Sequence, residues 1–520
     1  MKPFQAPLDD ILFCMDVAGA SDLPDWDAEL AGEIAGHFAA FAEGEIAPLD
    51  EPGDIQGCTL ENGRVRMPDG FVDFYKSYAE AGWPSLTAPE EFGGQGLSPM
   101  VLAYVSEIFS GANQSLQMVT GLVPGAIRTL LRFGTDDQKA RLLPPLVSGD
   151  WLATMCLTEP GAGSDLARIR TKAVEGPDGW RISGEKIFIS GGDQDMSAGI
   201  FHLVLARTSD NGLKGLSLFA CTMDQAGDSI RVVRIEEKMG LHASPTCQMV
   251  FDDAPGELIG GEGQGLAAMF TMMNHARADV ALQGVAHSAR AHDVARAYAE
   301  ERVQGRKTDG SPARLIDHAD VQRMLDRIDM LAMGGRMIAH LAFVTMEKGD
   351  NRDFVDLLTP VAKVFCTEAG MEAATLGMQV LGGYGYLREY RLEQTYRDVR
   401  IAAIYEGANA IHERVLATRL LKSGSAAAFK AFLDAEGAGE MRVLWEQAES
   451  RLLAMQDASA LAHDFMVLTQ LALLQALWGR MLARADAHPD PARIRRLAQT
   501  ALRDGPIFAR ARADRLAAMA

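Results

Sequence analysis

The feature that most constrains this chain is a double change in the spacing of its apolar residues. From the N-terminus to about residue 150 they recur at helical spacing, as in AELAGEIAGHFAAFAEGEI. Between about 151 and 265 they form short β-branched or alternating runs separated by Gly, Asp and Asn, which is typical of strands. The helical spacing then returns. We therefore predict an α+β protein, mainly α, with an antiparallel sheet or small barrel in the middle.

The length of the chain predicts several domains, because 520 residues exceed what one hydrophobic core usually supports. The changes of pattern set their limits. We predict an N-terminal helical domain (1–150), a middle β-domain (151–265), a C-terminal helical bundle (266–423) and an additional C-terminal helical region (424–520). We expect the last region to stabilise the bundle or a dimer and to supply no catalytic group.

Charge and composition exclude several classes of partner. A formal net charge of -20 makes general binding to nucleic acid or anionic membranes unfavourable. One local exception is the stretch 491–520, in which seven arginines stand against two aspartates. A basic face on terminal helices is the simpler interpretation of that stretch.

The cysteines and apolar stretches point to the cytoplasm. The six cysteines lack metal-ligand spacing, so we expect a reduced setting and no metal site. The first residues carry an early proline and paired aspartates where a signal peptide needs an apolar core. The apolar stretch 465–483 is interrupted by Gln and Arg, which predicts a buried helix and no membrane span.

Four short strings could carry chemistry. CLTEPGAGSDL (156–166) has glycines that allow backbone to approach a ligand, but it also fits a plain connection. In KIFISGG (186–192), period-2 alternation places Phe188 and Ser190 on one face, which suits a planar ring or ordinary strand packing. QVLGGYGY (379–386) ends a helix with glycines. In IYEG (404–407), Glu406 is either a helix-start residue or a base held in a dry pocket.

These strings, together with GW…L…PEEFGGQGL, GTDDQKARLLPPLVSGDW and KMGLHASPT, occur in the order and approximate spacing of the acyl-CoA dehydrogenase family. The resemblance covers roughly residues 30 to 423. Within the family, the chain resembles the larger bacterial group that includes 3-methylmercaptopropionyl-CoA dehydrogenase. It carries the group's ERVQGRKTDGSPARLIDHADVQRML, TMMNHAR and FQAPLDDILF strings.

The resemblance implies that FAD lies between the sheet and the bundle and is capped by a neighbouring subunit, so that the protein is a homo-oligomer, expected to be a dimer. Phe188 and Ser190 would face the isoalloxazine, and Arg302 and 379–383 would reach the partner's FAD. The implied cofactor-binding residues are Met155, Cys156, Leu157, Thr158, Gly163, Ser164, Phe188, Ile189, Ser190, Arg302, Gln379, Val380, Leu381, Gly382, Gly383, Ala408, Asn409 and Ala410. The implied substrate-binding residues are Ser164, Asn274, Arg277 and Gly407.

Glu406 matches the family's catalytic base. The implied reaction removes the α-proton of an acyl-CoA thioester and passes a β-hydride to the flavin. The Glu406 N–H and a flavin ribityl hydroxyl would hold the thioester oxygen. Some relatives place the base just before the arginine that matches Arg277, but Ala276 stands there in this chain.

The chain departs from the family at EGA (406–408), where the family has EGT. Two side chains that commonly contact FAD are therefore missing or shortened, and Asn409 is a candidate cap for the following helix. The leading interpretation is a dehydrogenase that passes electrons to an electron-transfer flavoprotein. The alternatives are an acyl-CoA oxidase, a flavin-containing DNA-associated homologue and an inactive homologue.

Overall fold

The computed structural model describes residues 2–519, which form two compact units. The β unit comprises Phe41–Val101 and Ala112–Ala276. The helical unit comprises the chain up to Ala40, Leu102–Gly111 and the chain from Arg277 on. Each unit is assembled from discontinuous segments, so the units cannot be compared one to one with the predicted consecutive domains. The predicted domain limits at 150, 265 and 423 therefore remain predictions.

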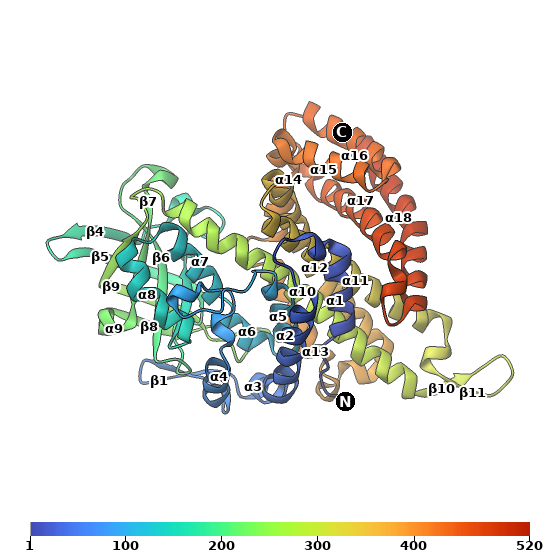
Figure 1. The fold of residues 1–520 in the computed structure, drawn as a ribbon, viewed down its shortest axis with the longest axis horizontal. Coiled ribbons are helices and arrows are strands. Elements are labelled where there is room, and N and C mark those ends of the chain that lie inside the picture. Colours follow the sequence, from blue (N-terminus) through green and yellow to red (C-terminus); the bar gives the residue numbers. More distant parts are fainter. Residues whose placement is uncertain (1, 520) are drawn as a thin grey trace. The chain divides into compact units, whose positions relative to one another are not determined.

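A seven-stranded sheet forms the centre of the β unit (Figure 1). Pairing in the order β6-β4-β5-β9-β7 returns to β6, and the ring closes through one bridge between Lys172 and Arg207. The pairings are antiparallel except that β3 and β4 run parallel to β6. The strands are β3 (Trp151–Cys156), β4 (Lys172–Gly176), β5 (Gly179–Ser190), β6 (Gly199–Arg207), β7 (Leu216–Thr222), β8 (Ile230–Ile235) and β9 (Thr246–Ile259).

Two strands explain why this sheet folds as a small barrel. The sequences of β6 and β7 are almost continuously apolar and both strands are buried along nearly their whole length, as expected for strands covered on both faces. The elements around the sheet in this unit are α3 (Asp50–Gln56), β1 (Thr59–Glu61), β2 (Arg64–Arg66), α4 (Phe71–Glu80), α6 (Gln114–Thr120), α7 (Val123–Phe133), α8 (Asp136–Ser148) and α9 (Met223–Ala226).

Long helices form the core of the helical unit. Gly284 of α10 lies so close to α12 that an added Cβ would sit 2.1 Å from the Cys366 carbonyl oxygen, so only glycine permits this crossing. The elements are α1 (Leu8–Ala18), β10 (Val303–Arg306), β11 (Pro312–Arg314), α11 (Ala319–Lys348), α12 (Arg352–Leu381), α13 (Leu392–Val399) and α14 (Asn409–Thr418). Three further helices cross the limits of the units: α2 (Ala28–Phe41), α5 (Val101–Ala112) and α10 (Gly265–Glu301).

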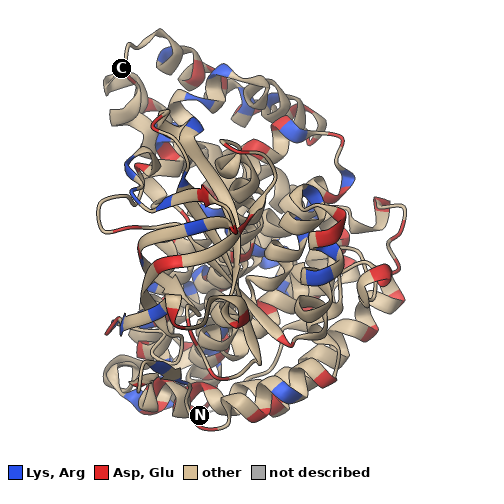
Figure 2. Ribbon diagram, turned by 90° about the vertical axis from the view of Figure 1, so that its left-hand side faces the viewer, with Lys and Arg blue, Asp and Glu red and all other residues tan. Residues whose placement is uncertain are grey.

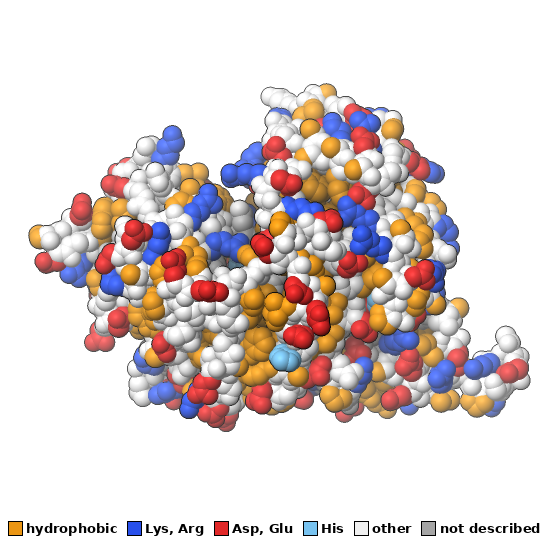
Figure 3. Space-filling view, viewed as in Figure 1, with side chains coloured by type: hydrophobic (Ala, Val, Ile, Leu, Met, Phe, Trp, Pro, Cys, Tyr) orange, Lys and Arg blue, Asp and Glu red, His pale blue; other side chains and the backbone are white. Residues whose placement is uncertain are grey.

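The C-terminal region adds four helices that pack on one another and on α11, α12 and α14. They are α15 (Gly424–Ala435), α16 (Gly439–Ala454), α17 (Ala462–Ala483) and α18 (Pro491–Met519). Figure 2 shows basic and acidic residues interspersed along these helices, and Figure 3 shows the two kinds of side chain adjacent on the surface. Each of the seven tail arginines contacts a carboxylate: Arg493, Arg495, Arg496, Arg503, Arg510, Arg512 and Arg515.

Two helical segments would pass a test for membrane spans by length and composition alone: Ala319–Lys348 and Ser459–Ala483. The most apolar window of the first is 94% buried inside the protein, and that of the second is 67% buried. Both segments therefore have the burial of core helices in a folded domain.

Candidate active site

The segment around Glu406 forms a tight left-handed loop in the helical unit. A short 3₁₀ helix, Arg400–Ala403, ends just before it, and α14 begins at Asn409. Glu406 has φ +54° and Gly407 has φ +89°. Glutamate in this region carries steric strain between its Cβ and the backbone, and such strain persists only where surrounding contacts hold it.

Three side chains hold the loop by its carbonyl groups. Arg277 Nε donates to the Glu406 carbonyl oxygen at 3.3 Å, and His412 Nε2 lies 3.0 Å from the same oxygen. Lys363 Nζ donates to the Gly407 carbonyl oxygen at 2.9 Å. Burial, followed by the nearby Arg277 and Lys363, lowers the pKa of His412 to about 4. His412 is therefore neutral at pH 7 and carries its proton on Nε2 in order to donate.

The carboxylate of Glu406 is left without a partner on one side. Its Oε2 atom is buried and makes no hydrogen bond within residues 2–519. Burial raises the pKa of Glu406 above its ordinary value, whereas Arg277 and Lys363 act to lower it. A desolvated carboxylate is a stronger base than one in water, because removal from water disfavours its charged form. Of the two roles expected from the sequence, the geometry favours a base.

Asn409 does not cap α14, so that expectation was wrong. The N-cap residue is Ala408, and it makes no side-chain capping bond. Asn409 is buried and turned toward α12, where its Oδ1 accepts from Lys363 Nζ at 2.8 Å and its Nδ2 donates to Glu368 Oε1 at 2.7 Å. The charged Lys363 ammonium is a stronger donor than a backbone N–H, and it takes the Asn409 side-chain oxygen that a helix cap would need.

Two of the predicted segments of the β unit meet at the end of β5. The Ile187 N–H donates to the Thr158 carbonyl oxygen at 2.9 Å. Phe188 is 59% exposed and Ile189 is 2% exposed, so burial alternates as expected. The strand itself is not regular, because a bulge lies between Lys186 and Ile189 and Phe188 has φ +58°. The exposed aromatic ring is thus held by a strained backbone.

A buried ion pair between Lys186 and Glu159 joins β5 to the loop that follows β3. Lys186 is fully buried, and its Nζ lies 2.9 Å from Glu159 Oε1 and 3.1 Å from the Leu157 carbonyl oxygen. Burial alone would raise the pKa of Glu159, but Lys186 and backbone N–H donors hold it below its ordinary value. The pair fixes the start of the loop, while Gly163 and Ser164 farther along it are exposed.

The remaining predicted residues divide into exposed groups and core groups. The Arg302 guanidinium lies 5.6 Å from the centre of the Tyr384 ring, which brings Arg302 beside the segment 379–383. In that segment, Gln379, Gly382 and Gly383 are exposed, whereas the side chains of Val380 and Leu381 belong to the core. Cys156 is fully buried, so only its backbone is available to a ligand. Asn274 is exposed on α10.

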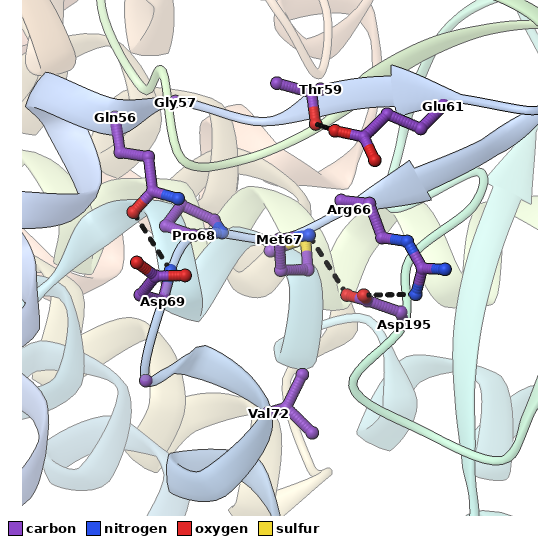
Figure 4. A pocket seen from close by; sticks show the side chains of 11 residues that line it. Gln56, Gly57, Thr59, Glu61, Arg66, Met67, Pro68, Asp69, Val72 and Asp195 are labelled. Carbon is purple, nitrogen blue, oxygen red and sulfur yellow. Dashed lines mark hydrogen bonds and ion pairs between the residues drawn. The ribbon is translucent and has the colours of Figure 1, made fainter.

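A pocket of about 420 Å³ in the β unit lies beside β1, β2 and the start of α4 (Figure 4). Its polar groups bond to each other: Arg66 donates to Asp195 at 3.1 Å, and the Asp69 N–H donates to Gln56 at 3.0 Å. None of the predicted site residues lines it. Its lining therefore gives no sign of a ligand.

Known protein families match the chain in three consecutive segments. They are described as the acyl-CoA dehydrogenase N-terminal domain (31–150), middle domain (154–254) and C-terminal domain (263–421). Together these matches cover more than half of the chain. The chain belongs to the acyl-CoA dehydrogenase family. It is an FAD-dependent oxidoreductase of that family, so the predicted family, fold and cofactor are confirmed.

Individual relatives extend this result. The 3-methylmercaptopropionyl-CoA dehydrogenase of Ruegeria pomeroyi is 39% identical over 488 residues, which are 86% of this chain and 83% of the relative. An acyl-CoA dehydrogenase from Bacillus anthracis, solved in complex with FAD, has a TM-score of 0.79 at 21% identity and covers 95% of this chain and 89% of its own. A structure described as the electron transferring flavoprotein of Acidaminococcus fermentans has a TM-score of 0.66 at 27% identity. The match covers 76% of this chain and 98% of that structure's chain.

The residues of this acyl-CoA dehydrogenase fit FAD. The exposed ring of Phe188, on a strained backbone, offers a flat apolar face of the kind that a flavin ring requires, and the preceding residue, Ile187, is hydrogen-bonded to the backbone of Thr158. Added Cβ atoms at Gly161 and Gly163 would meet nothing within 4 Å, so this loop is open to a ligand. The individual FAD contacts remain predictions.

Sequence reasoning missed Lys363 and His412. A lysine within the apolar run LLTPVAKVF was a usable signal, because a charged residue on the buried face of a helix needs a partner. His412 gave no comparable signal, since its role depends on the loop folding back over the first turn of α14.

Proposed function

We propose that this enzyme catalyses the α,β-dehydrogenation of an acyl-CoA thioester to the 2-enoyl-CoA. The observation that carries the proposal is Glu406, a carboxylate with a buried oxygen that has no partner within the described residues. It takes the α-proton as its general base. Bound FAD would supply the redox chemistry, as the acceptor of the β-hydrogen as a hydride when the α,β double bond forms.

The loop geometry supports this role. Because the Glu406 and Gly407 carbonyl groups are held by Arg277, His412 and Lys363, the loop is fixed before substrate arrives. Only the ionised carboxylate can accept a proton, and burial raises the pKa of Glu406. The rate should therefore fall as the pH drops through that raised pKa.

The finer assignments rest on the relatives. The substrate proposed is 3-methylmercaptopropionyl-CoA or a short acyl-CoA of similar size, which the 39% identity to the Ruegeria pomeroyi enzyme supports. An electron-transfer flavoprotein is the proposed acceptor, which the likeness to the Acidaminococcus fermentans structure supports. The proposed assembly is a cytoplasmic homodimer. The ion pairs of all seven tail arginines weigh against DNA binding by that region.

The replacement Glu406→Gln tests the catalytic role. It keeps the size of the side chain and removes the base, so FAD and acyl-CoA should still bind. Anaerobic addition of acyl-CoA should bleach the wild-type flavin, and bleaching by the variant should be slower by at least about 10²–10⁴-fold. Glu372→Gln is the matched control, because Glu372 is an exposed residue of α12 paired with Arg327. Bleaching of the Glu406 variant at the wild-type rate would disprove the assignment.

The same assay identifies substrate and acceptor. A panel of acyl-CoA thioesters should show the highest kcat/KM for 3-methylmercaptopropionyl-CoA or a close analogue. Reduced enzyme should be reoxidised rapidly by an electron-transfer flavoprotein and slowly by oxygen. Rapid reoxidation by oxygen would instead identify an acyl-CoA oxidase.

A further inference from the structure

Lys363 is a lysine in the middle of α12 whose side chain is fully buried. Its ammonium group donates to the Gly407 carbonyl oxygen at 2.9 Å and to Asn409 Oδ1 at 2.8 Å. Both acceptors belong to the short segment that follows Glu406, and both are uncharged. The cation therefore ties α12 directly to the loop that carries the base.

Burying a cation against neutral acceptors is costly, so a stable fold needs a reason to keep it. Burial lowers the pKa of Lys363 to about 7, while the charges of Glu406 and Glu368 act in the opposite direction. Core packing alone would be satisfied by methionine, which has a similar length and no desolvation cost. The position of the ammonium group at the catalytic loop offers the reason.

We propose that Lys363 is a positioning residue for Glu406: its ammonium group holds the left-handed loop closed and favours the ionised form of the Glu406 carboxylate. The inference rests on the function proposed above for Glu406. The hydrogen bond to Gly407 fixes the residue next to the base, and the positive charge stabilises the negative charge that the base needs.

Other charged groups also face Glu406, and one of them, Arg277, lowers the pKa of Glu406 more strongly than Lys363 does. Arg277, from α10, binds the Glu406 carbonyl oxygen and is also the predicted substrate contact. His412, from α14, is neutral at pH 7, and Asp279, from α10, raises the pKa of Glu406. Tyr405 donates to Gln283 and stays protonated, because burial raises its pKa. Lys363 thus holds the loop at Gly407, the residue after the base, whereas Arg277 holds the carbonyl group of Glu406 itself.

The test compares Lys363→Met, Lys363→Arg and Glu372→Gln as FAD-loaded enzymes. Lys363→Met removes the charge and keeps the shape of the side chain, and Lys363→Gln replaces it if the Met variant does not accumulate as folded protein. Lys363→Arg keeps the charge. Glu372→Gln is the matched control, since it removes an exposed carboxylate of the same helix that pairs with Arg327 and, within the described part of the chain, makes no contact with this loop.

The first measurement is the pH dependence of kcat/KM for acyl-CoA. Removing a nearby cation raises the pKa of Glu406, so the acidic limb of Lys363→Met should move upward by about one pH unit. At pH values below the limb the variant should then lose up to roughly tenfold more activity than on the alkaline plateau. Lys363→Arg should keep the acidic limb at its wild-type position, and so should Glu372→Gln. An acidic limb at its wild-type position in the Met variant overturns the electrostatic role.

The second measurement does not depend on turnover. Amide hydrogen exchange in a peptide covering 401–409 should be at least about tenfold faster in Lys363→Met than in the wild type. Unchanged exchange overturns the positioning role. If none of the acyl-CoA thioesters bleaches the flavin of the wild-type enzyme, the proposed function fails. The exchange experiment still decides whether Lys363 holds the loop.

Discussion

Replacing Arg493 with methionine tests how the C-terminal region is held. Arg493 of α18 lies 2.7 Å from Asp10 of α1 and 2.6 Å from Asp329 of α11, and its side chain is 12% exposed. Arg336 lies 2.6 Å from Glu107 and 3.7 Å from Asp10 in the same buried cluster. Two arginines thus face three carboxylates, and the Arg493→Met variant leaves only one arginine, Arg336, to face them.

The expected loss follows from the burial of the carboxylates. Removing one partner of a buried ion pair costs about 3–5 kcal/mol, because the remaining charge is neither solvated nor neutralised. Arg496→Met is the matched control: Arg496 lies on the same helix, is 52% exposed and pairs with the 33% exposed Asp326. The control should lose less than about 1 kcal/mol, as exposed pairs do.

The loss should depend on pH with a definite sign. Burial alone would raise the pKa of Asp10 and Asp329, but their hydrogen bonds and the nearby positive charges hold it below the usual range. In wild type, these carboxyls therefore contribute stability above about pH 4 that is lost as the pH falls. In the variant their pKa values rise, so the deficit should be largest near pH 7.5 and smaller near pH 5.

The assay is equilibrium unfolding in urea, followed by the fluorescence of the buried Trp445 and Trp478 in the tail helices. Each variant is measured at pH 7.5 and pH 5. A deficit no larger than that of Arg496→Met would refute the view that this cluster anchors the tail. A deficit that grows as the pH falls would refute the electrostatic explanation.

Two further outcomes are expected. Gly407→Ala should reduce kcat/KM by at least about tenfold, because it places a side chain at φ +89° with its Cβ 2.9 Å from His412 Nε2. Circular dichroism of this variant should show an intact fold, and full activity would contradict the need for glycine. Arg302→Ala should weaken FAD retention in a dimer-dependent manner, whereas Arg306→Ala on the exposed hairpin strand β10 should not. A wild-type monomer that holds FAD stoichiometrically in size-exclusion chromatography would exclude a shared site.

The sequence was sufficient for the order of the helical and β segments. Helical and strand periodicities differ strongly, so the helical, β and helical segments could be recognised from spacing alone. The sequence also singled out Glu406 as the candidate base, because its neighbours form a compact motif. These features are local, and local features are what a sequence displays directly.

The missing parts depend on contacts between distant segments. Lys363 precedes Glu406 by more than forty residues, and only the packing of α12 against α14 and the turn of the loop bring it to Gly407. The bulge at Phe188 depends on the register with β9, which alternation along one strand does not contain. Asn409 resembled a cap in sequence, yet a lysine on another helix takes its oxygen.

The contact between α14 and α17 has a consequence for exchanging parts of this enzyme with a relative. The helix that starts immediately after the base packs on a helix of the C-terminal region, and His463 lies 2.9 Å from Glu413 across that contact. A chimera joined at residue 423 would leave α14 facing a foreign surface three residues from Glu406. A junction placed before Arg400 would transfer the base, its helix and their packing surface together, and should give the more active hybrid.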